Sequence, residues 1–379
     1  MTRILSIHYL RGIAALGVLI YHASAFVGGY GSGLIPMDML RLGEAGVDVF
    51  FVISGFILTL VTQKSLGRLE FILGRLIRVG VPYWTVSLAL AGASLALPFA
   101  FRTMQWSVSD LLLSLSFVPS IAKNGALFPI LEPGWTLSLE MMFYGILALT
   151  LGLQPKLRSF VVMFVLAALA LLGLMAAFPV GVAWFFTQAV LVEFCFGIAI
   201  ALLFLGSWAP SRRVSLLFAG ASLAGFVLAS SHPPDAFSPD RLVWYGVPAG
   251  LLVAAAVLFE KKTCLRKSPA MTLFGDISYS LYLTHVLVLG MVAKVLGARI
   301  PGLAGDLLLF VAMAVAAIAV AYIFHVLVER PAFTLSARTR NLFGRSGRLR
   351  PAFAEAAGLS RFVRRRGAAA APMGKEAET

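Results

Sequence analysis

Charged residues are scarce in this sequence. Only 13% of its 379 residues are Asp, Glu, Lys or Arg, whereas 60% are hydrophobic and the mean hydropathy is +0.91. Soluble domains contain about 45 to 50% apolar residues, so this composition excludes a soluble globular protein. We therefore expect an integral membrane protein.

Cysteine is nearly absent, with two residues in the whole chain. Cys195 lies in an apolar run and Cys264 in a basic segment, so the two suggest neither a disulfide framework nor a paired metal motif. We expect no metal cofactor.

Acidic residues are outnumbered by basic ones, 17 to 31, which gives a formal net charge of +14. Such an excess can indicate nucleic-acid binding. Here, however, the Lys and Arg residues lie in short segments between apolar runs and near the C-terminus, rather than on one folded face. The charge therefore indicates membrane topology, and we expect no nucleic-acid partner.

Apolar runs close to the ~20-residue length that spans a bilayer recur along the chain. They predict an all-α membrane protein with ten transmembrane helices, which begin near residues 5, 44, 79, 133, 158, 184, 214, 242, 272 and 304. An even number of spans places both termini on one side, and 24 of the 31 Lys and Arg residues lie on that side against six on the other. Cytoplasmic loops are enriched in Lys and Arg, so both termini are expected in the cytoplasm.

The composition of the chain changes at Pro331. Residues 1–331 hold all predicted spans, and residues 332–379 are rich in Arg, Ala, Gly and Ser, which predicts a basic, disordered cytoplasmic tail. The cluster from Arg361 to Arg366 is a candidate contact for anionic membrane lipid. Between spans, residues 64–78 predict an interfacial amphipathic helix, and the apolar patch Leu111 to Val118 is too short to cross the membrane.

Ionisable residues inside membrane spans are costly and usually mark a functional site. The first span contains Arg11 and His22, eleven residues apart, which places them roughly 16 Å apart along a helix. Asp48 lies near the outer start of the second span, Glu140 seven residues into the fourth and His285 thirteen residues into the ninth. We expect His22, Asp48, Glu140 and His285 to converge in the outer half of the membrane.

Arginines gather at the inner side, where Arg11 is joined by Arg75 and Arg78. Guanidinium groups fit phosphate geometry, so a donor molecule with phosphate groups would dock there. At the outer level, a histidine is well matched to take a proton from an acceptor hydroxyl near neutral pH, and we expect Asp48 to orient the His22 ring. This arrangement predicts chemistry across the bilayer but does not identify the transferred group.

Five motifs in this chain resemble those of the membrane-bound acyltransferase 3 family, in the same order and over nearly the whole length to Pro331. Arg11 and His22 match its arginine and histidine with ten residues between them. The other four motifs are Gly46 to Leu58, Arg75 to Arg78, Gly134 to Tyr144 and Gly275 to His285. Each motif alone is weak, but together they are specific.

The resemblance implies an enzyme of the bacterial inner membrane that takes an acyl group, usually acetyl, from cytoplasmic acetyl-CoA. The implied acceptor is a carbohydrate hydroxyl of an exopolysaccharide or lipid-linked oligosaccharide at the outer face. It assigns His22 as general base or acyl carrier, Asp48 as its partner, and Glu140 and His285 as further site residues. It assigns coenzyme contacts to Arg11, Arg75 and Arg78. Without a fused hydrolase domain, the chain looks most like the exopolysaccharide branch.

Structural alternatives exist for these residues. Arg11 can anchor the first helix at the inner surface, Asp48 can cap a helix, and Glu140 and His285 can join helices by hydrogen bonds. Ala23 to Ala25 resembles a signal-peptide cleavage site, but we expect the first helix to be retained.

A transporter or flippase for a lipid-linked sugar is the alternative function. Peptidoglycan, a lipid, an antibiotic or a glucan is the alternative acceptor, and succinyl-CoA the alternative donor. The oligomeric state is undetermined.

Overall fold

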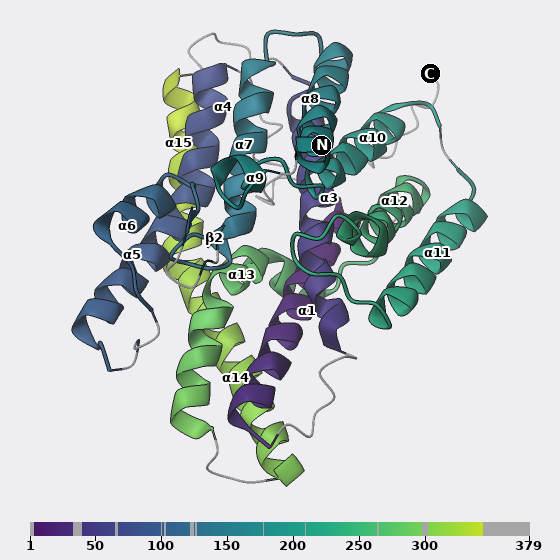
Figure 1. The fold of residues 1–379 in the computed structure, drawn as a ribbon. Coiled ribbons are helices and arrows are strands. Elements are labelled where there is room, and N and C mark those ends of the chain that lie inside the picture. The colour runs from purple at the N-terminus through teal and green to yellow at the C-terminus, as the bar shows by residue number, and fades with distance from the viewer. Residues whose placement is uncertain are drawn as a thin grey trace, which may run out of the picture.

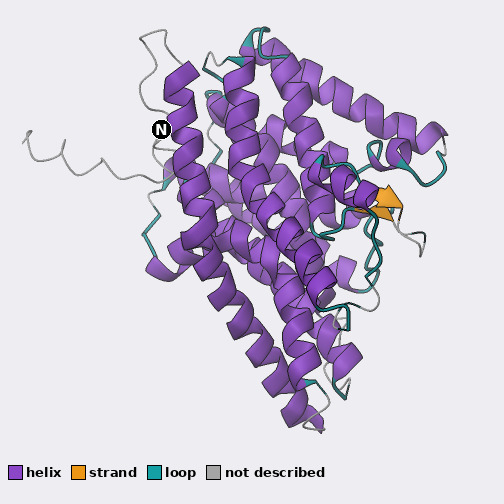
Figure 2. Ribbon diagram, turned by 90° about the vertical axis from the view of Figure 1, so that its left-hand side faces the viewer, coloured by secondary structure: helices purple, strands orange, loops and turns teal. Residues whose placement is uncertain are grey.

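The fold is a bundle of helices (Figure 1). The computed structural model describes residues 4–343 except for gaps at 33–39, 65–66, 100, 102–103, 122–124, 126, 177, 209, 264 and 298–301. Figure 2 shows the described chain as helices joined by loops, with one small sheet at the edge. In this sheet, β1 (Ser120–Ile121) pairs antiparallel with β2 (Leu127–Phe128), with Ser120 opposite Phe128.

Eight helical segments of the described chain are long and apolar enough to cross a membrane, which confirms the predicted all-α membrane class. They are Leu5–Tyr30 (α1), Arg41–Val61 (η1, Arg41–Ala45, and α3, Gly46–Val61), Arg68–Ala96 (α4, Arg68–Arg75, η2, Leu76–Gly80, and α5, Val81–Ala96), Pro155–Ala176 (α8), Arg212–Ser230 (α11), Leu242–Lys262 (η3, Leu242–Gly246, and α12, Val247–Lys262), Pro269–Leu296 (α13) and Gly302–Ala337. The last contains α14 (Gly302–Phe324), η4 (His325–Glu329) and most of α15 (Arg330–Phe343).

Two further apolar helices, α7 (Gly134–Leu149) and α10 (Leu191–Leu205), are shorter than a full span. Together with the eight long segments they follow the order of the ten predicted runs, and most begin within a few residues of the predicted position. The remaining described helices are α6 (Val108–Leu115) and α9 (Val182–Phe185). The hydrophobic pattern therefore located the spans, whereas two of them are shorter than a simple count of apolar residues suggests.

The predicted interfacial helix at residues 64–78 is not a separate element. Helix α4 continues through the π-helical turn η2 into α5, so this stretch forms the beginning of the third span. Helix α6 packs against the same span, because the Tyr83 hydroxyl hydrogen-bonds Ser114 Oγ at 2.8 Å. Tyr83 lies near the midpoint of Arg68–Ala96. The short apolar patch therefore folds back against the middle of a span.

The predicted tail begins too early. Residues 330–343 form α15, which lies beside α4 in Figure 1. Ser336 Oγ donates a hydrogen bond to the Gly74 carbonyl at 2.9 Å, and this contact ties the two helices together. Ala332 of α15 is buried despite the basic composition of the segment. Residues 344–379, with the Arg361 to Arg366 cluster, lie outside the described residues.

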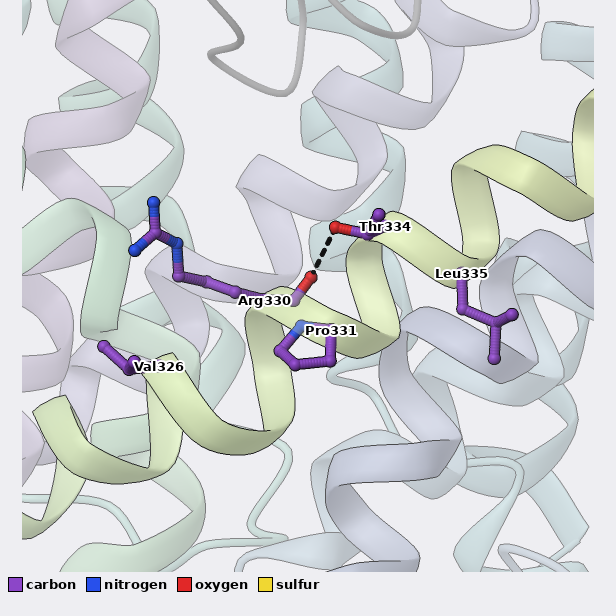
Figure 3. A pocket seen from close by; sticks show the side chains of 5 residues that line it. All are labelled: Val326, Arg330, Pro331, Thr334 and Leu335. Atoms are coloured by element: carbon purple, nitrogen blue, oxygen red, sulfur yellow. Dashed lines mark hydrogen bonds between the residues drawn. The ribbon is translucent and has the colours of Figure 1, made fainter.

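A surface groove of roughly 380 Å³ follows the junction of η4 and α15 (Figure 3). It is lined by Val326, Arg330, Pro331, Thr334 and Leu335, and the Thr334 hydroxyl donates to the Arg330 carbonyl at 3.0 Å. None of the predicted site residues is among these lining residues.

Helix α1 lies at the centre of the bundle because two of its faces are buried against different partners. Ile7, Leu10 and Ala14 belong to a hydrophobic cluster with α3, α10 and α12. Ala15, Leu19, Ala23 and Val27 belong to a second cluster with α13 and α14. The members of the second set are four residues apart and so form one ridge along the helix. This central position explains why α1 can carry functional groups that contact several helices.

Candidate active site

Helices α1 and α13 run parallel and cross closely at two glycines. A Cβ atom on Gly12 would lie 2.9 Å from the backbone nitrogen of Gly275, and a Cβ atom on Gly275 would lie 2.5 Å from the His8 carbonyl oxygen. Such approaches are too close for any side chain. The two backbones therefore meet only because both residues are glycine.

This crossing brings two of the predicted site residues together. His22 follows Gly12 by ten residues, and His285 follows Gly275 by the same ten residues. Because parallel helices rise equally, both histidines reach one level roughly 15 Å beyond the crossing. Their ring centroids are 5.0 Å apart, at an interplanar angle of 51°.

The hydrogen bonds of His285 define which of its nitrogens can act as a base. Nδ1 lies 2.8 Å from the Tyr282 carbonyl oxygen and 3.1 Å from that of Leu281. A carbonyl only accepts, so the neutral ring carries its hydrogen on Nδ1 and a lone pair on Nε2. This Nε2 is buried and has no hydrogen-bond partner among the described residues. It is therefore available to accept a proton from a bound molecule.

Asp48 does not orient His22 as predicted, because it is bound to an arginine. Both of its carboxylate oxygens accept hydrogen bonds from Arg241, at 2.9 and 2.8 Å, and no described hydrogen bond joins it to His22. Gly46, just before Asp48, packs against Ala14, two turns of α1 before His22. Depth counted from helix ends was misleading, because α1 continues far beyond the level at which α3 begins.

Arg241 is a buried partner of Asp48 that the sequence analysis did not identify. Its guanidinium binds Glu44 at 2.6 Å as well as Asp48, and its side chain is 2% exposed. It lies directly before the apolar run of η3 and α12, opposite the acidic start of the second span. Acidic and basic residues at the starts of two spans are the pattern that could have revealed this pair.

Glu140 is joined to the arginine side of the site rather than hydrogen-bonded to the histidines. It accepts hydrogen bonds from Ser54 Oγ at 2.8 Å and from the Tyr144 hydroxyl at 2.5 Å. The Tyr144 ring lies 5.6 Å from the Arg75 guanidinium, which is also 5.6 Å from the Phe71 ring. These contacts form a chain from the middle of the bundle to Arg75.

The three predicted arginines share one level of the bundle. The Tyr279 hydroxyl of α13 donates to the Val79 carbonyl at 2.7 Å, which fixes the register of α13 against η2. Arg75 precedes Val79 by four residues, as Gly275 precedes Tyr279, so Arg75 lies level with the glycine crossing. Arg11 is next to Gly12 in that crossing. Arg78 packs over the Phe333 ring at 5.3 Å.

The predicted residues thus form two groups in one bundle. The histidine pair lies roughly 15 Å along α13 from the level of the arginines, with Glu140 and Tyr144 reaching from the middle toward Arg75. Among the described residues, no cluster of three or more His, Cys, Asp or Glu side chains could hold a metal ion. The arrangement can bind an anion at one level and move a proton at the other.

Comparison with known proteins identifies the family of this chain. A family model described as an acyltransferase domain matches residues 4–326. The exopolysaccharide production protein ExoZ of Rhizobium meliloti (strain 1021) is 33% identical over 81% of this chain and 95% of its own length. The acyltransferase MdmB of Streptomyces mycarofaciens is 28% identical over 90% and 94%, and nodulation protein 10 of Rhizobium leguminosarum bv. viciae is 25% identical over 86% and 92%. No solved structure matches significantly. The chain therefore belongs to the acyltransferase family and is a multi-pass membrane enzyme that performs O-acyl transfer.

Proposed function

We propose that this enzyme transfers an acetyl group from acetyl-CoA to a hydroxyl group of an exopolysaccharide or lipid-linked sugar. The observation that carries the proposal is the separation of the arginine level from the histidine pair within one bundle. Coenzyme A is long and carries its phosphates at one end and its thioester at the other. A donor held at the arginines can therefore present its thioester toward the histidines.

The residues have distinct roles in the proposed reaction. Arg11, Arg75 and Arg78 bind the phosphates of the donor, since guanidinium groups form charge-assisted hydrogen bonds with them. At the other level, a histidine takes the proton of the acceptor hydroxyl while the hydroxyl oxygen attacks the thioester carbonyl. The carbon–sulfur bond then breaks, and the same proton passes to the leaving sulfur. The acetyl ester and free coenzyme A are the products.

Either histidine can act as the base, but the geometry favours His285. Its Nε2 already carries the lone pair, and His22 lies beside it to bind the acceptor or share the proton. Asp48 acts indirectly in this proposal, because its bond to Arg241 holds α3 against the loop before η3. Glu140 holds Tyr144 against Arg75 and so supports the donor site.

The proposed orientation places the arginines at the cytoplasmic side of a bacterial inner membrane and both termini in the cytoplasm. Its basis is the distribution of Lys and Arg, with 24 residues on the side of the termini and six on the other. The donor then comes from the cytoplasm, where acetyl-CoA is made, and the acceptor meets the histidine pair from outside.

The test combines donor turnover with analysis of the product. His22→Ala and His285→Ala should each insert into the membrane but lose O-acetylation of surface carbohydrate by at least about a hundredfold, as expected for a general base. Arg75→Ala with Arg78→Ala should weaken binding of acetyl-CoA. His232→Ala is a matched control that should keep O-acetylation. This histidine lies between α11 and η3 and stacks on Trp244, away from the histidine pair. Normal acetate content in both histidine variants would refute the proposal. Release of coenzyme A from succinyl-CoA alone would change the donor and keep the site.

A further inference from the structure

Glu132 belongs to a third part of the chain that reaches the neighbourhood of the histidine pair. It lies in the loop before α7, next to Pro133, whose carbonyl oxygen accepts a hydrogen bond from the Tyr282 hydroxyl at 3.2 Å. Tyr282 is one turn from His285 on α13, and the two ring centroids are 5.9 Å apart. The end of this loop is therefore held beside the histidine pair.

Helix α1 also carries a residue close to Glu132. The Tyr21 ring lies 4.8 Å from that of His22, and the Tyr21 hydroxyl is within electrostatic range of the Glu132 carboxyl. Tyr282 is within electrostatic range of the same carboxyl. One neighbour of each histidine is thus within electrostatic range of this acidic side chain.

The Glu132 carboxyl is available to a ligand. The residue is exposed to solvent, although enough protein surrounds the carboxyl that burial raises its pKa above the ordinary value. Among the described residues, no ion pair and no side-chain hydrogen bond of this carboxyl is found. The unpartnered Nε2 of His285 is the second polar group at this place that lacks a partner.

We propose that Glu132 binds the acceptor, and that it selects a neutral sugar ring rather than one carrying a carboxylate or phosphate. A carboxylate accepts hydrogen bonds from the hydroxyl groups beside the reacting one, and such charge-assisted bonds are strong. It repels an anionic substituent at the same position. Glu132 positions the ring, while the hydroxyl proton still passes to a histidine. This inference rests on the proposed function.

The test uses purified protein in lipid nanodiscs with radiolabelled acetyl-CoA. Methyl glucoside and methyl glucuronide are offered together at equal concentration as neutral and anionic probes. The wild-type enzyme should favour the glucoside by at least tenfold. Glu132→Gln should lower transfer to the glucoside about tenfold through a higher acceptor KM and should reduce the preference. Glu132→Asp should recover part of both, and Asp235→Asn, in the loop before Arg241, is the control carboxylate.

Two measurements test this inference separately from the proposed function. They are the binding of acetyl-CoA and the O-acetate content of the cell surface. Glu132→Gln should bind acetyl-CoA as the wild type does and yet reduce the O-acetate of cell-surface polysaccharide. Unchanged acetate content in this variant, or equal use of the glucuronide by the wild-type enzyme, overturns the role of Glu132 alone. A wild-type protein that neither binds acetyl-CoA nor acetylates any carbohydrate overturns the proposed function and this inference with it.

Discussion

Replacing Arg241 with methionine should destabilise the protein more than any change to the histidine pair. The guanidinium is 2% exposed, and its removal leaves Asp48, 0% exposed, and Glu44, 15% exposed, without their partner. Breaking a buried ion pair by removing one member costs about 3 to 5 kcal/mol. Because two carboxylates lose their partner at once, we expect about 5 kcal/mol for Arg241→Met.

The change at Asp48 should cost less. Asp48→Asn leaves Arg241 bound to Glu44, and the amide oxygen can still accept one hydrogen bond, so we expect about 3 kcal/mol or less. The double variant, Arg241→Met with Asp48→Asn, should lose about 2 kcal/mol less stability than the sum of the two single losses. The reason is that the interaction between the two residues can be lost only once.

The assay is unfolding in mixed detergent micelles, with the free energy of unfolding measured for all four proteins of the cycle. Transfer activity is then measured at low temperature, where the single variants stay folded. Asp48→Asn should keep most of its activity under those conditions. If Asp48→Asn is as stable as the wild type but inactive, the reasoning is refuted, because Asp48 would then act on the chemistry and not on the packing of α3.

Two further predictions concern other contacts. Gly275→Ala should cost about 1 to 3 kcal/mol and lower transfer, because the new methyl group meets the His8 backbone and separates the histidine pair; unfolding and activity measurements check this. Gly145→Ala, whose Cβ would have nothing within 4 Å, is its control, and equal behaviour of the two variants would contradict the prediction. Ser107→Ala should loosen α6 by about 1 kcal/mol, because it removes the cap. Hydrogen bonds from Ser107 hold the pKa of Asp110 below its ordinary value of 3.8. The stabilisation is therefore full above pH 3.8 and is lost as the pH falls through the lowered pKa, which hydrogen exchange of α6 across this range would show.

The composition and the hydrophobic runs were sufficient to predict the class of the fold. A span of about 20 residues is dictated by the thickness of the bilayer, so the periodicity of a single sequence locates it without knowledge of its neighbours. The errors occurred where a short segment joins a longer one. Residues 68–78 are part of the third span, and residues 330–343 form α15, because packing against neighbouring helices decides such cases.

The spatial grouping of the polar residues was predicted in part. The approach of His22 to His285 follows from an identical spacing, glycine followed ten residues later by histidine, in two parallel helices. This spacing is visible in the printed sequence, but its meaning depends on the two glycines meeting. Asp48 was assigned to the wrong partner, because depth was counted from helix ends and the helices begin at different levels.

The sequence by itself determined that the chain lies in a membrane, where its spans are and which polar residues they carry, because burying charge in lipid is so costly that each such residue is conspicuous. Only the tertiary structure decided which of these residues meet. A helix presents a new direction every 100°, so the partner of a side chain depends on the crossing point and the relative level of two helices. Arg241 therefore contacts Asp48, and the Pro133 carbonyl contacts Tyr282 beside the histidine pair, through pairings of distant segments that no local pattern specifies.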